Sequence, residues 1–194
     1  KRQTQSGLLY YVMSQDVLGF SSSSDTLGAA VNFASGTLTT NSASGSAYPT
    51  GLPIDAWRLI STPSVLNETG LTQVFDELGT QDNTVWRVFR YDDVSNTYKD
   101  NPVDLNSTES YWIYQKTEDN LTMDTPAGKT GDMSGTEITL KTGWNFIGSP
   151  YPFQVPLQLD QVQFYGPLTY GISGESWSPV VTELDPWNGY VVYN

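Results

Sequence analysis

Carboxylates and side-chain amides around position 95 come closest to a recognisable site in type and spacing. Asp92, Asp93 and Asp100 lie close in the chain to Asn96 and Asn101. Ca²⁺ takes roughly six to eight oxygen ligands, so a loop of this composition could bind that ion. The residues do not follow the Asp-x-Asp-x-Asp-Gly register of calcium loops. We therefore expect a solvated turn and no cofactor, with Ca²⁺ as the alternative.

Paired carboxylates could also hydrolyse a glycosidic bond, which needs two acids facing each other across that bond. The acids that could pair are Glu175, Glu183 and Asp185, or Glu109 with Asp104. Nothing in their spacing singles out one pair. The chain has no His and no Cys, which excludes a Ser-His-Asp triad, a thiolate nucleophile and thiolate or imidazole metal ligands. We expect a protein without enzymatic activity.

Aromatic rings offer a different chemistry, because an exposed ring can stack on the face of a sugar while nearby polar groups hold its hydroxyls. Alternate residues of a strand share a face. We assign Val85, Phe89 and Tyr91 to the core, which turns Trp86 and Arg90 outward. The candidate ligand-binding residues, chosen as outward-facing on strands or beside turns, are Trp86, Arg90, Tyr165, Trp177, Asp185 and Trp187.

The elements that would position these residues belong to a duplicated unit. Trp57 and Trp144 each begin a Trp-x-x-Ile-x-x-Pro motif. Matches follow downstream at one constant spacing, and they are Tyr91 with Tyr170, Tyr98 with Trp177, Leu105 with Leu184, Tyr111 with Tyr190 and Tyr114 with Tyr193. We expect Trp57 and Trp144 to occupy equivalent buried positions.

The predicted fold is mainly β, with each unit made of a Trp strand, a short helix or turn, and three strands. Leu71, Val74, Phe75 and Leu78 form one apolar stripe, which predicts a helix over 70–79. At most one helical turn is expected over 156–163. Both units should pack into one compact β-rich body, since each is small. The expected divisions are an N-terminal Ser/Thr-rich segment with strands (1–51), the first unit (52–116), connector strands (117–142) and the second unit (143–194).

Charge and composition limit the partners. The chain of 194 residues has 9 basic and 21 acidic residues, for a net charge of −12. Such a protein is poorly suited to nucleic acid, whose phosphates attract Lys and Arg, or to anionic membrane surfaces. No apolar stretch approaches the roughly 20 residues of a membrane-spanning helix. Low charge with many Ser, Thr, Asn, Gly and aromatic residues is typical of secreted bacterial β-proteins.

The stretch from Thr142 to Pro152, TGWNFIGSPYP, together with WNGYVV at 187–192, resembles a motif of large secreted bacterial proteins exported by type IX secretion. In that family a GWN-x-IGNPYP strand opens a β-rich unit and a glycine-aromatic-apolar-Val strand closes it. The chain has Ser149 where the family has Asn, and it lacks the acidic-aromatic pair after the second Pro. The resemblance implies secretion and cell-surface display, and it implies no catalytic residues.

We therefore expect a non-catalytic extracellular binding module of a larger secreted or surface-anchored bacterial protein. Its expected partner is a polysaccharide or another surface glycan, with neighbouring domains of the same protein as further contacts. The alternative is a structural spacer, adhesin or filament domain of a cell-surface protein. A row of exposed coplanar aromatic rings would favour glycan binding, whereas strand edges pairing with neighbouring chains would favour the spacer.

Overall fold

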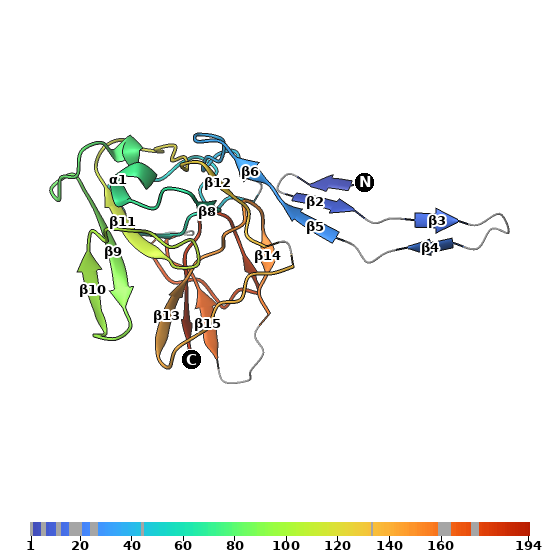
Figure 1. Cartoon of the computed structure of the whole chain (residues 1–194). Helices are drawn as coiled ribbons and strands as arrows, with labels where there is room; N and C mark the ends of the chain where they lie inside the picture. The colour runs from blue at the N-terminus through green and yellow to red at the C-terminus, as the bar shows by residue number, and fades with distance from the viewer. Residues whose placement is uncertain are drawn as a thin grey trace.

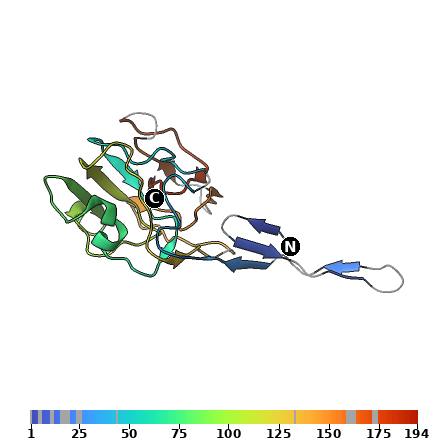
Figure 2. The ribbon, with the colours of Figure 1, turned by 90° about the horizontal axis from the view of Figure 1, so that it is seen from above.

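The computed structural model describes residues 27–194 except 44, 133, 159–163 and 172–174, and also 2–4, 7–10, 13–15 and 21–23, with side chains from residue 30 onward. The described chain is mainly β, as predicted, and its sheets are antiparallel. Figures 1 and 2 show a body built from the later strands, from which the N-terminal strands project.

Five short strands form the projecting part. They pair as a three-stranded sheet, β1 (Arg2–Thr4), β2 (Gly7–Tyr10) and β5 (Leu27–Ala30), and as a two-stranded ribbon, β3 (Met13–Gln15) with β4 (Ser21–Ser23). The chain then enters the body through β6 (Asn32–Phe33), which pairs with β12 (Gly128–Lys129); β12 also pairs with β8 (Val65–Leu66). The connector over 117–142 thus carries one short strand, β12, instead of the two expected.

The first unit contains a four-stranded sheet in the order β10-β9-β11-β7. Its strands are β7 (Arg58–Ile60), β9 (Trp86–Asp92), β10 (Thr97–Asp100) and β11 (Tyr111–Gln115). The predicted helix is confirmed in two short pieces, α1 (Leu71–Val74) and the 3₁₀ turn η1 (Asp76–Leu78), and the apolar stripe of both is buried. Gly79 ends it with a φ of 70°, in the left-handed region that glycine favours.

The second unit repeats this arrangement with three strands in the order β13-β17-β15. They are β13 (Trp144–Ile147), β15 (Tyr165–Leu168) and β17 (Tyr190–Tyr193), accompanied by the pair β14 (Val155–Pro156) and β16 (Glu183–Leu184). Where we expected at most one helical turn over 156–163, the chain is a strand at its start, and 159–163 lie outside the described residues.

The two units share one pairing register. The residues that matched in sequence also match in their strand partners, namely Ile60 with Tyr111 and Ile147 with Tyr190, and Trp112 with Phe89 and Val191 with Leu168. The agreement extends to a loop contact, because the Leu71 amide donates to the Val103 carbonyl at 3.1 Å while the Leu157 amide donates to the Thr182 carbonyl at 3.0 Å. These residues therefore have the same strand pairing in the two units.

The units are joined by a reciprocal exchange between their strands. The Ser61 amide donates to the Trp187 carbonyl at 3.1 Å, and the Gly148 amide donates to the Thr108 carbonyl at 2.9 Å. Ser61 corresponds to Gly148 and Thr108 to Trp187, so the second bond is the first one with the units interchanged. Each unit thus donates one backbone hydrogen bond to the other at the junction.

Three apolar clusters hold this arrangement, and one of them, with Ile147, Leu184, Tyr190 and Val192 buried, is the core of the second unit. The larger core is enclosed by the inner face of the first sheet, the helix and residues 43–52, and Trp187 of the second unit inserts into it. A separate cluster fills the space between the units, with Leu59, Leu168 and Val191 buried and Trp112, Phe146 and Tyr170 packed around them. Both faces of the first sheet are therefore covered over part of their area.

This double coverage overturns our assignment of faces in β9. Trp86 is 0% exposed and shares the inner face with Val88, whereas Phe89 and Tyr91 lie half-buried on the other face. The prediction that alternate residues of β9 share a face was correct. The face that points into the core was assigned one residue out of step, and such a shift places every side chain on the opposite face. Trp86 was expected to face outward, and that expectation is wrong.

The expected burial of Trp57 and Trp144 is also wrong. The two rings are 37% and 40% exposed, although their positions correspond. Trp57 packs on Tyr114 with ring centroids 5.2 Å apart, and Trp144 packs on Tyr193 at 5.1 Å. Trp144 is the first residue of β13 and Trp57 comes directly before β7, so both rings lie at the start of their strands.

Candidate functional site

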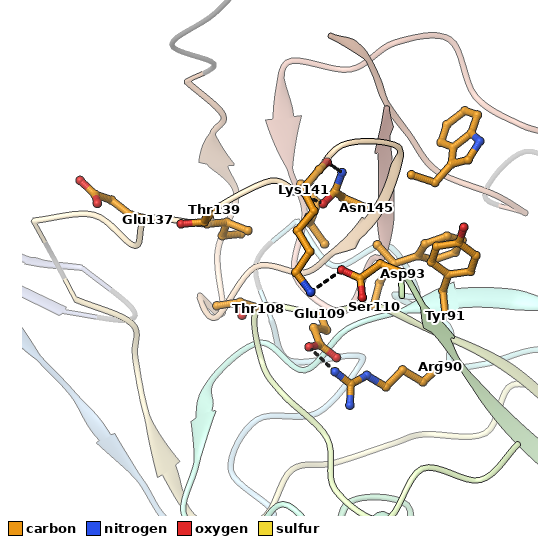
Figure 3. A pocket seen from close by; sticks show the side chains of 14 residues that line it. Arg90, Tyr91, Asp93, Thr108, Glu109, Ser110, Glu137, Thr139, Lys141 and Asn145 are labelled. Atoms are coloured by element: carbon orange, nitrogen blue, oxygen red, sulfur yellow. Dashed lines mark hydrogen bonds and ion pairs between the residues drawn. The ribbon is translucent and has the colours of Figure 1, made fainter. Parts of the chain in front are cut away.

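A pocket of about 220 Å³ opens where the end of β9 meets the start of β13 (Figure 3). Its polar lining comes from three places: β9 and the turn after it, the residues before β11, and the connector before β13. The side chains with ionisable or aromatic groups are Arg90, Tyr91, Asp93, Glu109, Glu137, Lys141, Trp144 and Phe146. The pocket therefore depends on both units and on the connector between them.

Two ion pairs cross the pocket (Figure 3). The Arg90 guanidinium contacts the Glu109 carboxylate at 2.8 Å, and the Lys141 ammonium contacts the Asp93 carboxylate. Lys141 is held in place by Asn145, whose side chain accepts from the Lys141 amide and donates to the Lys141 carbonyl, both at 2.8 Å. This bracket fixes the turn that leads into β13, and with it the position of the Trp144 ring.

Aromatic rings form the wall between the units. The Tyr91 and Phe146 rings are stacked with centroids 4.8 Å apart and an interplanar angle of 28°. The Tyr98 ring meets Phe146 edge-on at 6.0 Å. Such pairs contribute about 0.5–1.5 kcal/mol beyond their buried area, so the wall is rigid enough to hold the polar groups in fixed positions.

A row of exposed aromatic rings continues from Trp144 across the second sheet. Trp144 is the register partner of Tyr193, and Tyr193 is the register partner of Tyr165. Direct cross-strand partners point to the same face of a sheet. Tyr193 is 46% exposed and Tyr165 is 58% exposed, so three neighbouring strands each present one ring to solvent. The Trp144 and Tyr193 rings are inclined by 69°, and they do not form the coplanar row named above as the mark of a flat platform.

The six residues proposed from sequence fall in different places. Arg90 lines the pocket and Tyr165 ends the exposed row. Trp177 is 46% exposed and lies against Trp112 and Tyr170, outside the pocket lining. Asp185 is half-buried, where its carboxylate accepts from Gln154 at 2.8 Å.

Trp187, proposed as exposed, is 1% exposed. It follows Pro186 in a tight turn with a φ of 66°, and its ring enters the core of the first unit. Thr108 stands at its counterpart in the first unit, so the repeat gave no sign of an apolar role. The proposal of Trp86 and Trp187 as ligand-binding residues is therefore wrong.

Sequence reasoning missed Trp144 and Tyr193. Trp144 was placed in the core because it repeats Trp57, and Tyr193 was noted only as the match of Tyr114. The sequence did contain a signal. Phe146 lies two residues from Trp144, and Val191 lies two residues from Tyr193, so each pair shares a strand face. These faces extend past the area that the first unit covers. What the sequence could not give is where the partner unit stops covering these strands.

The loop proposed as an alternative Ca²⁺ site has its carboxylates engaged elsewhere. Asp92 pairs with Lys99 at 2.6 Å, and the bond from Lys99 lowers the Asp92 pKa to about 2. Asp93 pairs with Lys141 and Asp100 with Arg87. Three oxygens do approach within 4.8 Å of one another at Asp76, Glu77 and Asp124, which is fewer than the roughly six to eight that Ca²⁺ takes.

Comparison with known proteins gives no match to a family model, to a curated protein or to a solved structure. Within the described residues, no helix has the length and apolar character to cross a membrane. What the site can bind must therefore be inferred from its own side chains.

Proposed function

We propose that this chain is a non-catalytic, carbohydrate-binding module of a larger secreted or surface-anchored bacterial protein. One observation carries the proposal: the Trp144 ring is 40% exposed at a pocket lined by two ion pairs. An exposed ring supplies an apolar surface for the face of a sugar. Fixed charged groups beside it supply donors and acceptors for hydroxyls, and this mixture is typical of small-ligand sites.

The polar groups suit hydroxyls because their geometry is already set. The Arg90–Glu109 pair offers guanidinium donors and carboxylate acceptors side by side, and Lys141 with Asp93 does the same across the pocket. Hydrogen bonds to charged groups are roughly twice as strong as neutral ones. Side chains that are already paired lose little freedom when a ligand arrives, which lowers the entropic cost of binding.

Binding without turnover is part of the proposal. Glycoside hydrolysis needs one carboxyl group that donates a proton and a second that attacks or activates water. Of the three carboxylates in the pocket lining, Glu109 and Asp93 are each engaged with a cation, which leaves Glu137 without a second unpaired carboxyl group. The resemblance of TGWNFIGSPYP to units of type IX-exported proteins supports display outside the cell.

The test is retention on insoluble polysaccharides and titration calorimetry with soluble ones. Trp144→Ala should abolish binding while the melting temperature stays within a few degrees of the parent. The matched control is Trp57→Ala, which removes the corresponding ring of the first unit, outside the lining of this pocket, and should leave binding unchanged. An equal loss of binding in both variants would contradict the proposal. A parent protein that no polysaccharide retains would contradict it as well.

A spacer or filament role is the second candidate, and one observation favours it. β10 forms an edge of the four-stranded sheet, and its four residues are exposed. An open edge can pair with a neighbouring strand. However, Lys99 and Asp100 occupy this edge and are engaged in ion pairs with Asp92 and Arg87, and charged side chains are what proteins use to discourage edge pairing. Glycan binding is therefore the better supported role.

A further inference from the structure

We propose that the ligand is a single, uncharged glycan chain that runs from the pocket across β13, β17 and β15, with Trp144, Tyr193 and Tyr165 under successive parts of it. This inference rests on the proposed function and specifies its substrate class. It follows from three features: the spacing of the exposed rings, the angle between two of them, and the distribution of charge around the pocket.

The spacing indicates a repeating ligand. Neighbouring strands lie about 4.8 Å apart, so three rings on adjacent strands span about 10 Å. Trp144, Tyr193 and Tyr165 are joined by direct register pairs, which sets one ring on each strand. A monosaccharide at the pocket would use only Trp144. A chain of similar units would use all three, and its affinity would therefore grow with its length until the row is filled.

The ring angle argues for one chain in solution rather than a crystal face. A flat crystalline surface needs rings that lie in one plane. The Trp144 and Tyr193 rings are inclined by 69°, so both cannot lie flat on the same plane. A single chain can twist between successive sugars and offer a differently inclined face to each ring.

The charges argue against a polyanion. Both cations of the pocket, Arg90 and Lys141, are neutralised by the carboxylates of Glu109 and Asp93. Glu137 adds a further negative charge to the lining, with no ion pair among the described residues. The whole chain carries a net charge of −12, which repels carboxylated or sulfated chains at long range. An uncharged chain avoids this repulsion and can still use every hydrogen-bonding group.

The experiment compares polymers and lengths with one protein. Neutral soluble glucans and mannans, polyanionic alginate and polygalacturonate, and amorphous and crystalline cellulose are tested for retention, and oligosaccharides of two to six sugars of the retained type are titrated by calorimetry. We expect binding to a neutral chain, no binding to the polyanions, and preference for amorphous over crystalline material. Affinity should rise from two sugars upward and level off once the chain covers all three rings.

Variants separate the row from the pocket. Tyr193→Ala and Tyr165→Ala should each weaken binding of the six-sugar ligand about tenfold, equivalent to about 1.4 kcal/mol. Tyr165→Ala should leave the two-sugar ligand unaffected. Tyr114→Ala, the counterpart of Tyr193 in the first unit, is the matched control and should have no effect on either ligand.

The outcomes distinguish this inference from the function on which it rests. Loss of binding in Trp144→Ala with full binding in Tyr193→Ala and Tyr165→Ala overturns the extended chain and leaves a pocket-only lectin. Retention by polyanions, or stronger retention by crystalline material, overturns the ligand class. A parent retained by no glycan overturns the carbohydrate-binding function itself, and this inference with it.

Discussion

The Tyr111 and Tyr190 hydroxyls make the same hydrogen bond in the two units. Each accepts from the backbone amide five residues earlier, Asn106 to Tyr111 at 2.6 Å and Asp185 to Tyr190 at 2.7 Å. Both phenols are buried, and burial raises the pKa of Tyr190 to about 12 and that of Tyr111 further. Each ring thus pins the loop before its closing strand to the core behind it.

Replacing either tyrosine by phenylalanine should leave a partly buried amide without its partner. We expect Tyr111→Phe and Tyr190→Phe each to lower the free energy of unfolding by about 1–2 kcal/mol, the cost of an unsatisfied buried donor. Urea denaturation followed by fluorescence measures it. Tyr165→Phe, which removes an exposed hydroxyl, is the control. A loss no larger than in this control would show that the two bonds contribute nothing.

Among the residues that one unit contributes to the other, Trp187 should destabilise the fold most when it is truncated. Its ring is buried in the core of the first unit, so Trp187→Ala should lower the free energy of unfolding by about 3–5 kcal/mol. Trp177→Ala removes a largely exposed ring and should cost far less. Thermal melts of the two variants decide this, and equal stabilities would mean that Trp187 is not a core residue.

Gly148 lies where the units cross and has no room for a side chain. A Cβ there would lie 2.5 Å from the Glu109 carbonyl oxygen and from the Ser61 Cβ. Gly148→Ala should therefore lower stability by about 1–3 kcal/mol, the usual cost of overpacking. In the control Gly70→Ala, the added carbon meets only the end of the flexible Gln73 side chain. If both variants melt alike, the junction is looser than the contacts indicate.

Glu77 should make stability depend on pH. Burial is the main cause that raises the Glu77 pKa from 4.5 to about 7 in the folded protein, and burial also raises the pKa of Asp124 beside it. A raised carboxyl pKa favours the protonated form in the fold. This stabilisation is therefore complete below about pH 4.5 and is lost as the pH rises through 7. Because Glu77 is partly exposed, we expect a decline on the order of 1–2 kcal/mol.

Glu77→Gln removes the titrating group and retains an acceptor for the Asp124 amide. Its free energy of unfolding should exceed that of the parent at pH 8 and match it near pH 4, as measured by denaturation at a series of pH values. Glu118→Gln, at an exposed position, should follow the parent curve. A parent curve that stays flat between pH 4.5 and 7 would contradict the expectation.

Local pattern predicted the type and place of most elements, because strand alternation and helical periodicity act over a few residues. The helix near 70–79 and the closing strand ending at Gln115 are examples. The same alternation could not show which face of β9 points into the core of the first unit. The opposite face packs toward the second unit, and it also carries apolar side chains. Phe89 and Tyr91 serve one contact, and Trp86 and Val88 the other.

The candidate site was predicted only in part for a related reason. Arg90 and Tyr165 were identified from their neighbours along the chain, but the pocket is assembled from segments as distant as Arg90 and Trp144. Trp187 was misplaced because its ring packs in a core built by residues that lie far from it in the sequence, in the first unit and before and after it. Those distances are set by how the units pack, which no local pattern records.

The insertion of Trp187 into the first unit has a consequence for how the protein is made. A ribosome releases the chain from its N-terminal end, and domains generally fold as they emerge. Here the first unit emerges with a gap in its core and with Ser61 lacking its partner carbonyl at Trp187. It can close only once the second unit has been synthesised. Until then the nascent chain presents the apolar surface against which the Trp187 ring will pack.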